Sequence, residues 1–273
     1  MIAVSINLGN ASRRKAFLLS ENIIELRNVT KSFGNVNAVD GISLTIKRGE
    51  VVGLIGDNGA GKSTLIKVLS GVHKPDHGEI YLRGQKVTQW DSAKSRHSGI
   101  ETVYQDRALA VQQSITRNIF MGREIANSLG FIDAKKQYQE ANRLMREIGF
   151  TSKVFDPDSP VATLSGGERQ GVAIARALYF DADLIILDEP TTALSLTETN
   201  KVFSFIENVR AKGRSIVFIG HNIYHVYDIA ERFIVLDRGR VVLTLTKAET
   251  PTAEYLIETM HSIARSGHVK GEA

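Results

Sequence analysis

The stretch Gly56-Asp57-Asn58-Gly59-Ala60-Gly61-Lys62-Ser63 matches the phosphate-loop pattern at every specified position. It follows the apolar run 51–55, which predicts a strand, and it precedes 62–69, which predicts a helix. Glycines let backbone N–H groups surround a phosphate, and the positive end of the following helix faces the same anion. A glycine-rich turn with an incidental lysine is the alternative, which the order of strand, loop and helix disfavours. We therefore predict a nucleotide site, with Mg²⁺ on the Ser63 hydroxyl, formed by Gly56, Asn58, Gly59, Ala60, Gly61, Lys62, Ser63 and Thr64.

Two carboxylates follow a second apolar run. Residues 184–187 predict a strand buried on both faces, and Asp188 and Glu189 come directly after it, where α/β folds place their ligands. Phosphoryl transfer depends on positioning and charge stabilisation, so we expect Asp188 to hold Mg²⁺ and Glu189 to act as general base on the attacking water. His221 follows a third such run, 215–219. A histidine there is more often structural, but beside a nucleotide site it becomes a catalytic candidate.

The segment Leu164-Ser165-Gly166-Gly167-Glu168 (the signature segment) has two interpretations. Ser165 and Glu168 have the spacing of a capping box, which can start a helix without any further role. A cap does not require two consecutive glycines, whose conformational cost is offset if the backbone must approach a second phosphate. With this segment the chain resembles the ABC-type ATPases, whose defining signature is Leu-Ser-Gly-Gly followed by Gln or Glu. The resemblance covers about residues 22–262.

The resemblance to ABC-type ATPases implies roles for further positions, with ATP and Mg²⁺ as cofactors. Phe33 stands where this family has the aromatic residue that stacks on adenine, and the alternative is an ordinary core phenylalanine. Gln105 stands where the family has a glutamine that reaches Mg²⁺ and the attacking water. The signature segment would bind the ATP held by a partner subunit, through Ser165, Gly166 and Gly167.

Within this family, the stretches 99–105, 114–115, 118–124 and 171–176 resemble the ribose, xylose and fructose class of sugar importers. Each motif occurs once, so the chain would pair with a second copy or with a sister subunit. The resemblance implies a transmembrane sugar permease as partner, a sugar-binding protein as an indirect partner, and a cytoplasmic location, peripheral on the inner face of the membrane. The chain departs from the family at Ser195, where most members have aspartate, and at Gly220, where serine is usual. The first departure leaves open the cross-subunit role of that carboxylate.

The hydrophobic pattern predicts an α/β protein: a P-loop ATPase core of mostly parallel strands with helices, an antiparallel β subdomain and a helical insert. Alternation in 23–26 and 42–46 indicates the antiparallel sheet. Strand signal fades over about 106–163, where a helix capped by Asp133 and closed by Gly149 belongs to the insert. The chain then divides into an N-terminal extension, 1–21, an ABC ATPase domain, 22–262, and a flexible tail, 263–273.

Two more local patterns predict single elements. Ser195 and Glu198 have capping-box spacing at the start of an amphipathic helix that Gly213 ends. The runs 233–236 and 241–243 flank an Asp-Arg-Gly turn and predict a hairpin.

Composition excludes several classes of protein. The chain has 34 Lys+Arg against 30 Asp+Glu, a net charge of +4 that is too small and too scattered for a nucleic-acid-binding face. We therefore expect no nucleic-acid partner. The absence of cysteine excludes disulfides, a thiolate nucleophile and a cysteine zinc site. No apolar run approaches the roughly 20 residues of a membrane span.

Two rival functions share part of this motif set. A non-transport ABC ATPase could act on DNA, ribosomes or cluster assembly, but chromosome-type members insert a long coiled coil for which the span from Lys62 to Leu164 is too short. Ribosome-acting members usually carry two cassettes. A pseudo-ATPase is disfavoured because the complete set is present: Lys62, Ser63, Gln105, Asp188, Glu189 and His221. We expect an ATP-hydrolysing subunit whose dimer closes around ATP and reopens on hydrolysis.

Overall fold

The computed structural model describes residues 21–105, 108–149 and 156–266. The larger of its two sheets has the strand order β10-β9-β3-β8-β7-β6. Every neighbouring pair is parallel except β9 and β10, which are antiparallel. The strands are β3 (Val51–Ile55), β6 (Ile100–Val103), β7 (Leu184–Asp188), β8 (Ser215–Ile219), β9 (Arg232–Asp237) and β10 (Arg240–Thr246). The predicted strands at 184–187 and 215–219 are confirmed, and both are buried almost throughout.

The smaller sheet is antiparallel and has the order β2-β1-β4-β5. Its strands are β1 (Asn22–Phe33), β2 (Val36–Lys47), β4 (His77–Leu82) and β5 (Gln85–Val87). The predicted antiparallel sheet is thus confirmed, although β1 is longer than the run 23–26 that indicated it. Strand β1 continues to Phe33 because its pairing with β2 resumes after each of several register shifts.

The helices are α2 (Lys62–Leu69), α3 (Ser92–His97), α4 (Ile115–Phe120), α5 (Ala134–Glu147), α6 (Gly166–Tyr179), α7 (Leu196–Ala211), α8 (Ile223–Ile229) and α9 (Ala253–Ser266), with short 3-10 turns η1 (Val161–Thr163) and η2 (Lys247–Glu249). The predicted caps are confirmed: Asp133 accepts from the Lys136 N–H, and capping boxes start α6 and α7. Gly149 has φ 91° just beyond α5, as a helix-ending glycine requires.

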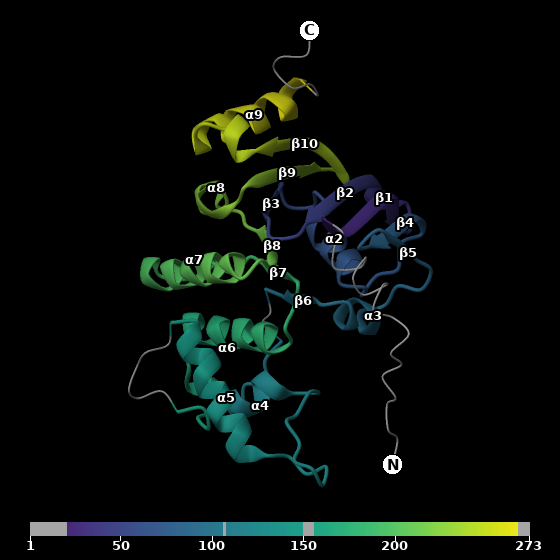
Figure 1. Ribbon diagram of the computed structural model, residues 1–273. Coiled ribbons are helices and arrows are strands. Elements are labelled where there is room, and N and C mark those ends of the chain that lie inside the picture. The colour runs from purple at the N-terminus through teal and green to yellow at the C-terminus, as the bar shows by residue number, and fades with distance from the viewer. Residues whose placement is uncertain (1–20, 106–107, 150–155, 267–273) are drawn as a thin grey trace.

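The parallel strands separate two hydrophobic cores. Alternate residues of β8 show this directly, since Ile216 and Phe218 pack with α6, α7 and α8, whereas Val217 and Ile219 pack with α2 and the antiparallel sheet. This is the period of two that a strand buried on both faces must have. Figure 1 shows the result: the strands form a central column, with α6 to α9 on one side and α2 with the small sheet on the other.

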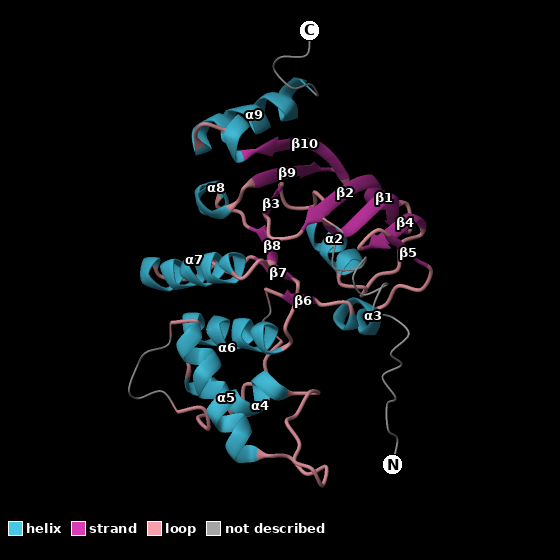
Figure 2. Cartoon of the chain, in the orientation of Figure 1, coloured by secondary structure: helices cyan, strands magenta, loops and turns pink. Residues whose placement is uncertain are grey.

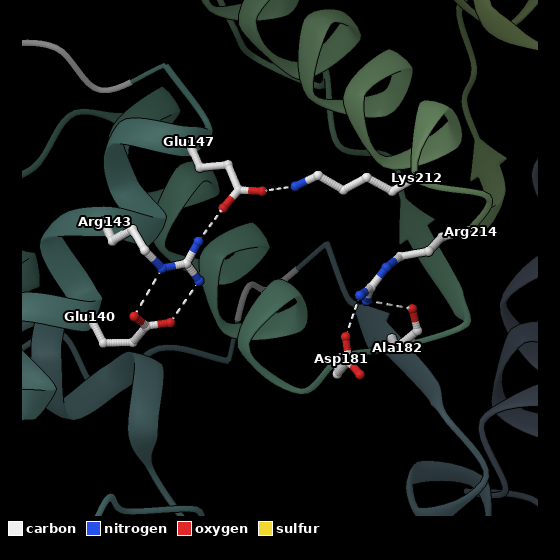
Figure 3. A network of polar contacts seen from close by, with 7 residues as sticks. All are labelled: Glu140, Arg143, Glu147, Asp181, Ala182, Lys212 and Arg214. Carbon is white, nitrogen blue, oxygen red and sulfur yellow. Dashed lines mark hydrogen bonds and ion pairs between the residues drawn. The ribbon is translucent and has the colours of Figure 1, made fainter.

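Helices α4 and α5 pack against α6 beyond the end of the strand column (Figure 2). An ion-pair network ties α5 to the end of α7: Arg143 contacts Glu140 at 2.6 Å and Glu147 at 2.7 Å, and Lys212 contacts Glu147 (Figure 3). These side chains are partly exposed, so each pair contributes at most about 1 kcal/mol.

The C-terminal part of the domain ends later than the sequence predicted. The β9–β10 hairpin is confirmed, with Arg238 at φ 44° and Gly239 at φ 80° in its turn. Helix α9 then continues to Ser266, past residue 262, because Ile263 is buried against Val235 and Leu243. The proposed tail therefore loses 263–266 to the helix. Its remaining residues, 267–273, and residues 1–20 of the proposed extension lie outside the described residues.

Candidate nucleotide site

The phosphate loop connects β3 to α2 and has the backbone conformation that its glycines predict. Gly59 has φ 82° and Gly61 φ 102°, values that glycine adopts without strain. At Gly61 a Cβ atom would lie 2.3 Å from the carbonyl oxygen of Ala38, so only glycine fits where β2 approaches the loop. The conformation of this loop is therefore determined by its packing against the antiparallel sheet as well as by its own glycines.

Lys62 is the first residue of α2, and only 7% of its surface is exposed. Its ammonium donates to the carbonyl oxygens of Gly56 and Asp57, so it lies under the loop. Burial lowers the pKa of Lys62, and the negative charges of Glu189, Asp57 and Asp188 oppose that shift. The lysine and the two carboxylates at the end of β7 thus act on one another electrostatically, as a shared site requires.

The start of α2 is prepared for an anion. No side chain caps it, and its first turn contains no acidic residue. The first N–H groups of a helix have no intrahelical acceptor and carry partial positive charge. Ser63 in this turn is exposed, and Thr64 is half-buried. These donors can therefore bind phosphate oxygens without displacing an internal side chain.

Glu189 is held in an unusual backbone conformation. It has φ 50°, a left-handed value that costs about 1–2 kcal/mol for a non-glycine residue, and its N–H donates to the Ile219 carbonyl at 3.0 Å. Its carboxylate is mostly buried, with Oε1 2.6 Å from His221 Nε2 and Oε2 accepting from the Thr192 hydroxyl at 3.2 Å. Strain of this kind is concentrated at functional sites. Thr192 was not a predicted site residue, since its contact depends on the turn after β7.

The strand order brings the other predicted residues to the same edge of the sheet. Strands β3, β8, β7 and β6 are consecutive and parallel, so their carboxyl ends lie together. The phosphate loop follows β3, His221 follows β8, Asp188 ends β7, and Gln105 follows β6 with an exposed side chain. Four motifs that are separated in the sequence therefore meet at one edge.

Gly220 precedes His221 and is buried. A Cβ there would lie 3.0 Å from Phe218 and from Val226, which is tighter than ordinary van der Waals contact. The glycine that stands here in place of the usual serine therefore lies where Phe218 and Val226 leave little room for a Cβ.

Phe33 is an exposed residue at the end of β1, so the alternative of a core phenylalanine is wrong. Its residue exposure is 48%, and its ring meets His73 edge-on at 5.3 Å between centroids. It pairs with Val36 across the turn to β2, the strand whose Ala38 contacts the phosphate loop. An exposed ring on this hairpin can stack on a planar base.

The donor set is compatible with Mg²⁺ held partly by nucleotide. Mg²⁺ prefers oxygen ligands and is usually held by one or two protein groups together with phosphate oxygens and water. Ser63, in the helix that follows β3, and Asp188, at the end of β7, offer such oxygens at the same edge of the sheet, with β8 between the two strands. Among residues 21–105, 108–149 and 156–266 there is no cluster of three His, Cys, Asp or Glu residues that could hold a metal by itself. The chain thus fits a metal that arrives with a phosphate ligand.

The signature segment lies on the other face of the sheet. Ser165 caps α6, and Ser165 and Gly166 are exposed. Residues of α6 pack in the core with α7 and α8, whereas residues of α2 pack in the core with the antiparallel sheet. The structure therefore does not bring Ser165, Gly166 and Gly167 together with the phosphate loop. Ser165 and Gly167 both donate instead to Glu198 of α7.

Known proteins resemble this chain in sequence and fold. The ABC transporter family profile matches residues 39–192. A xylose/arabinose import ATP-binding protein of Sulfolobus acidocaldarius is 46% identical over 89% of this chain and 95% of that protein. A ribose import ATP-binding protein of Caldanaerobacter subterraneus is 40% identical over 81% of this chain but only 44% of that protein. A solved dimeric ATP-binding cassette in a post-hydrolysis state with ADP and Pi has a TM-score of 0.72 and 26% identity, covering 82% of this chain and 98% of that one.

Proposed function

This chain belongs to the ABC transporter family, and we propose that it is the ATP-hydrolysing subunit that energises sugar import through a separate transmembrane permease. The xylose/arabinose import relative, which is similar along almost its whole length, supports the sugar class. The relatives named for import give no support to action on DNA, ribosomes or cluster assembly. No helix in the described part of the chain has the length and apolar character to span a bilayer.

The phosphate loop and the four strand ends supply the chemistry of hydrolysis in this proposal. Backbone N–H groups of the loop and Lys62 bind the β- and γ-phosphates. Glu189 accepts a proton from the attacking water, and His221 orients the Glu189 carboxylate through their 2.6 Å contact. Mg²⁺, when bound, neutralises phosphate charge; the residues that would hold it are Ser63, Gln105 and Asp188. Phe33 stacks on the adenine.

The observation that carries the dimeric mechanism is the separation of two helix N-termini. Helices α2 and α6 begin at the phosphate loop and the signature segment, but they belong to cores on opposite faces of the sheet. A nucleotide bound at the loop of one copy can meet a signature segment only if a partner supplies it. Two copies would therefore close around two ATP molecules, and hydrolysis would reopen them. The solved relative with ADP and Pi is a dimer.

The partners follow from this role. The permease would hold two such subunits on the inner face of the membrane, as a homodimer or with a sister ATPase, and a sugar-binding protein would act indirectly. The neighbouring genes should encode a multi-span permease and a sugar-binding protein. Neighbours for DNA repair or ribosome function instead would contradict the transport assignment.

A mixed dimer tests the shared site. Lys62→Ala damages the phosphate loop and Ser165→Arg blocks the signature segment, so each homodimer has two damaged sites. In the mixed dimer, the intact loop of the Ser165→Arg copy faces the intact signature segment of the Lys62→Ala copy. Both copies carry Glu189→Gln to prevent hydrolysis. We expect one occluded ATP per purified mixed dimer and almost none in either parent. Equal, negligible occlusion in all three would contradict sharing between subunits.

A further inference from the structure

The carboxylate of Glu198, on α7, lies at the N-terminus of α6. Its Oε1 accepts from the Ser165 hydroxyl at 3.2 Å and from the Gly167 N–H at 3.2 Å. The approach is close: a Cβ on Gly167 would lie 2.2 Å from this oxygen. The second glycine of the signature segment therefore leaves the space that the Glu198 carboxylate uses.

The cap of α7 uses only one of the two oxygens of the Glu198 carboxylate. Its Oε2 accepts from the N–H and the hydroxyl of Ser195, each at 3.0 Å, which completes the capping box of α7. Helix α6 has its own capping box, in which Glu168 accepts from the Ser165 N–H at 2.8 Å. The two bonds to Oε1 are thus additional to both caps. They use the Ser165 hydroxyl and the Gly167 N–H, which are donors of the segment that faces the partner's ATP in the proposed function.

We propose that Glu198 is a resident anion that competes with the γ-phosphate of the partner's ATP for the signature segment, and thereby sets the ATP concentration at which two subunits close. This inference rests on the proposed function, because it needs a signature segment that serves the partner's nucleotide. Each N–H or O–H hydrogen can donate well to one acceptor at a time. A phosphate that approaches these donors also meets the negative charge of Glu198 at close range.

The Glu198 carboxylate is stable in its present position, and a cavity beside it can accept the carboxylate when it moves. Hydrogen bonds, the strongest from the Ser195 N–H, keep the pKa of Glu198 below its ordinary value, so it is an anion at neutral pH. A cavity of about 120 Å³ adjoins it, and Lys201 lies on the lining of that cavity. Residues three apart on a helix are neighbours, so Lys201 can pair with a displaced Glu198 carboxylate. Rotation of one side chain could therefore clear the signature segment.

Glu198→Gln is the sharpest test, because glutamine also completes a capping box and keeps α7 capped while removing the charge. The matched control is Glu207→Gln, which removes the same charge from an exposed position on α7. Both are made in the Glu189→Gln background, and the ATP concentration for half-maximal dimer formation is measured by light scattering. We expect Glu198→Gln to lower this midpoint about two- to thirtyfold, the range for one charge at a helix terminus. Glu207→Gln should leave it unchanged.

Two further measurements separate the explanations. ADP affinity of the single subunit should be unchanged in Glu198→Gln, because ADP lacks the competing phosphate and binds the loop on the other face. Glu198→Ala, which removes both charge and acceptor, should lower the midpoint at least as far, with its melting temperature recorded to account for the lost cap. An unchanged or higher midpoint in Glu198→Gln would overturn the inference and leave the proposed function standing. If the Glu189→Gln parent forms no dimer at any ATP concentration, both fail.

Discussion

His221 Nε2 lies 2.6 Å from Oε1 of Glu189, although the two residues follow different strands. Strands β7 and β8 are parallel neighbours with Asp188 opposite Ile219, so the residues just beyond each strand meet at the same edge. The backbone of Glu189 is also held in place, since its N–H donates to the Ile219 carbonyl. The carboxylate is therefore positioned by the register of two strands rather than by its own loop alone.

We expect Glu189→Gln to bind ATP normally and to hydrolyse it at least about 100-fold more slowly, because an amide cannot accept the proton of the attacking water. Phosphate release by the purified protein measures hydrolysis, and equilibrium binding of ATP measures affinity. Thr192→Val is the matched comparison: it removes one contact to Glu189 but leaves the base, so its rate should fall much less. Near-normal turnover in Glu189→Gln would remove Glu189 from the mechanism.

Phe33→Ala should weaken ATP binding by about 5- to 150-fold, which corresponds to the 1–3 kcal/mol of one base–aromatic stack. Because the side chain is exposed, the melting temperature should change little. Inorganic tripolyphosphate has no base, so the parent protein and Phe33→Ala should bind it with the same affinity. Phe33→Trp keeps an aromatic ring and should retain ATP binding. Equal losses for ATP and tripolyphosphate would show that Phe33 acts on the phosphate loop and not on adenine.

Gly53→Ala should destabilise the fold by about 1–3 kcal/mol through overpacking. A Cβ at Gly53 in β3 would lie 2.3 Å from Val226 Cγ1, on helix α8. Val226→Ala removes that atom, so the double variant should be more stable than the sum of the single changes predicts, by about 0.5–3 kcal/mol. Urea unfolding of all four proteins measures this coupling. Val68 lies in the core on the other face of the sheet, so the loss of stability from Val68→Ala should simply add to that from Gly53→Ala, which makes it the control. If the losses from Gly53→Ala and Val226→Ala also simply add, the close packing of α8 against Gly53 is refuted.

Glu101→Gln should change how stability depends on pH. Burial raises the pKa of Glu101 to about 7, although Arg123 lies 3.6 Å away. Between the ordinary value of 4.5 and about 7, the folded protein therefore keeps a proton that the unfolded chain has released. Stability from this group is lost as pH rises through that window, by at most about 1.4 kcal/mol per pH unit.

The glutamine variant has no such proton. Its stability should match that of the parent below the ordinary value of 4.5, become progressively higher than that of the parent up to about pH 7, and show no further gain above that. Urea unfolding at several pH values gives the difference in free energy of unfolding. A difference that is constant with pH would show that Glu101 does not titrate in this window.

The sequence by itself determined the chemistry of each motif, because that chemistry lies in consecutive residues. The phosphate loop needs glycines beside Lys62 and Ser63, and the capping boxes need only residues three apart. The two kinds of sheet were also predictable, since strands buried on one face or on both have different hydrophobic patterns. Local patterns do not predict that the last helix continues past residue 262, because Ile263 gains its burial from distant residues, Val235 and Leu243.

Only the tertiary structure decided which motifs meet. The order β3-β8-β7-β6 depends on the pairing of strands far apart in the chain, and local patterns do not specify such pairing. The pairing of β7 with β8 placed His221 on Glu189, and the pairing of β1 with β2 in the other sheet left Phe33 exposed at the end of β1. Two-sided burial of the same strands put α2 and α6 on opposite faces. The contact of Glu198 with Ser165 depends likewise on the packing of α7 against α6, because the two residues are 33 positions apart in sequence and no local periodicity relates them.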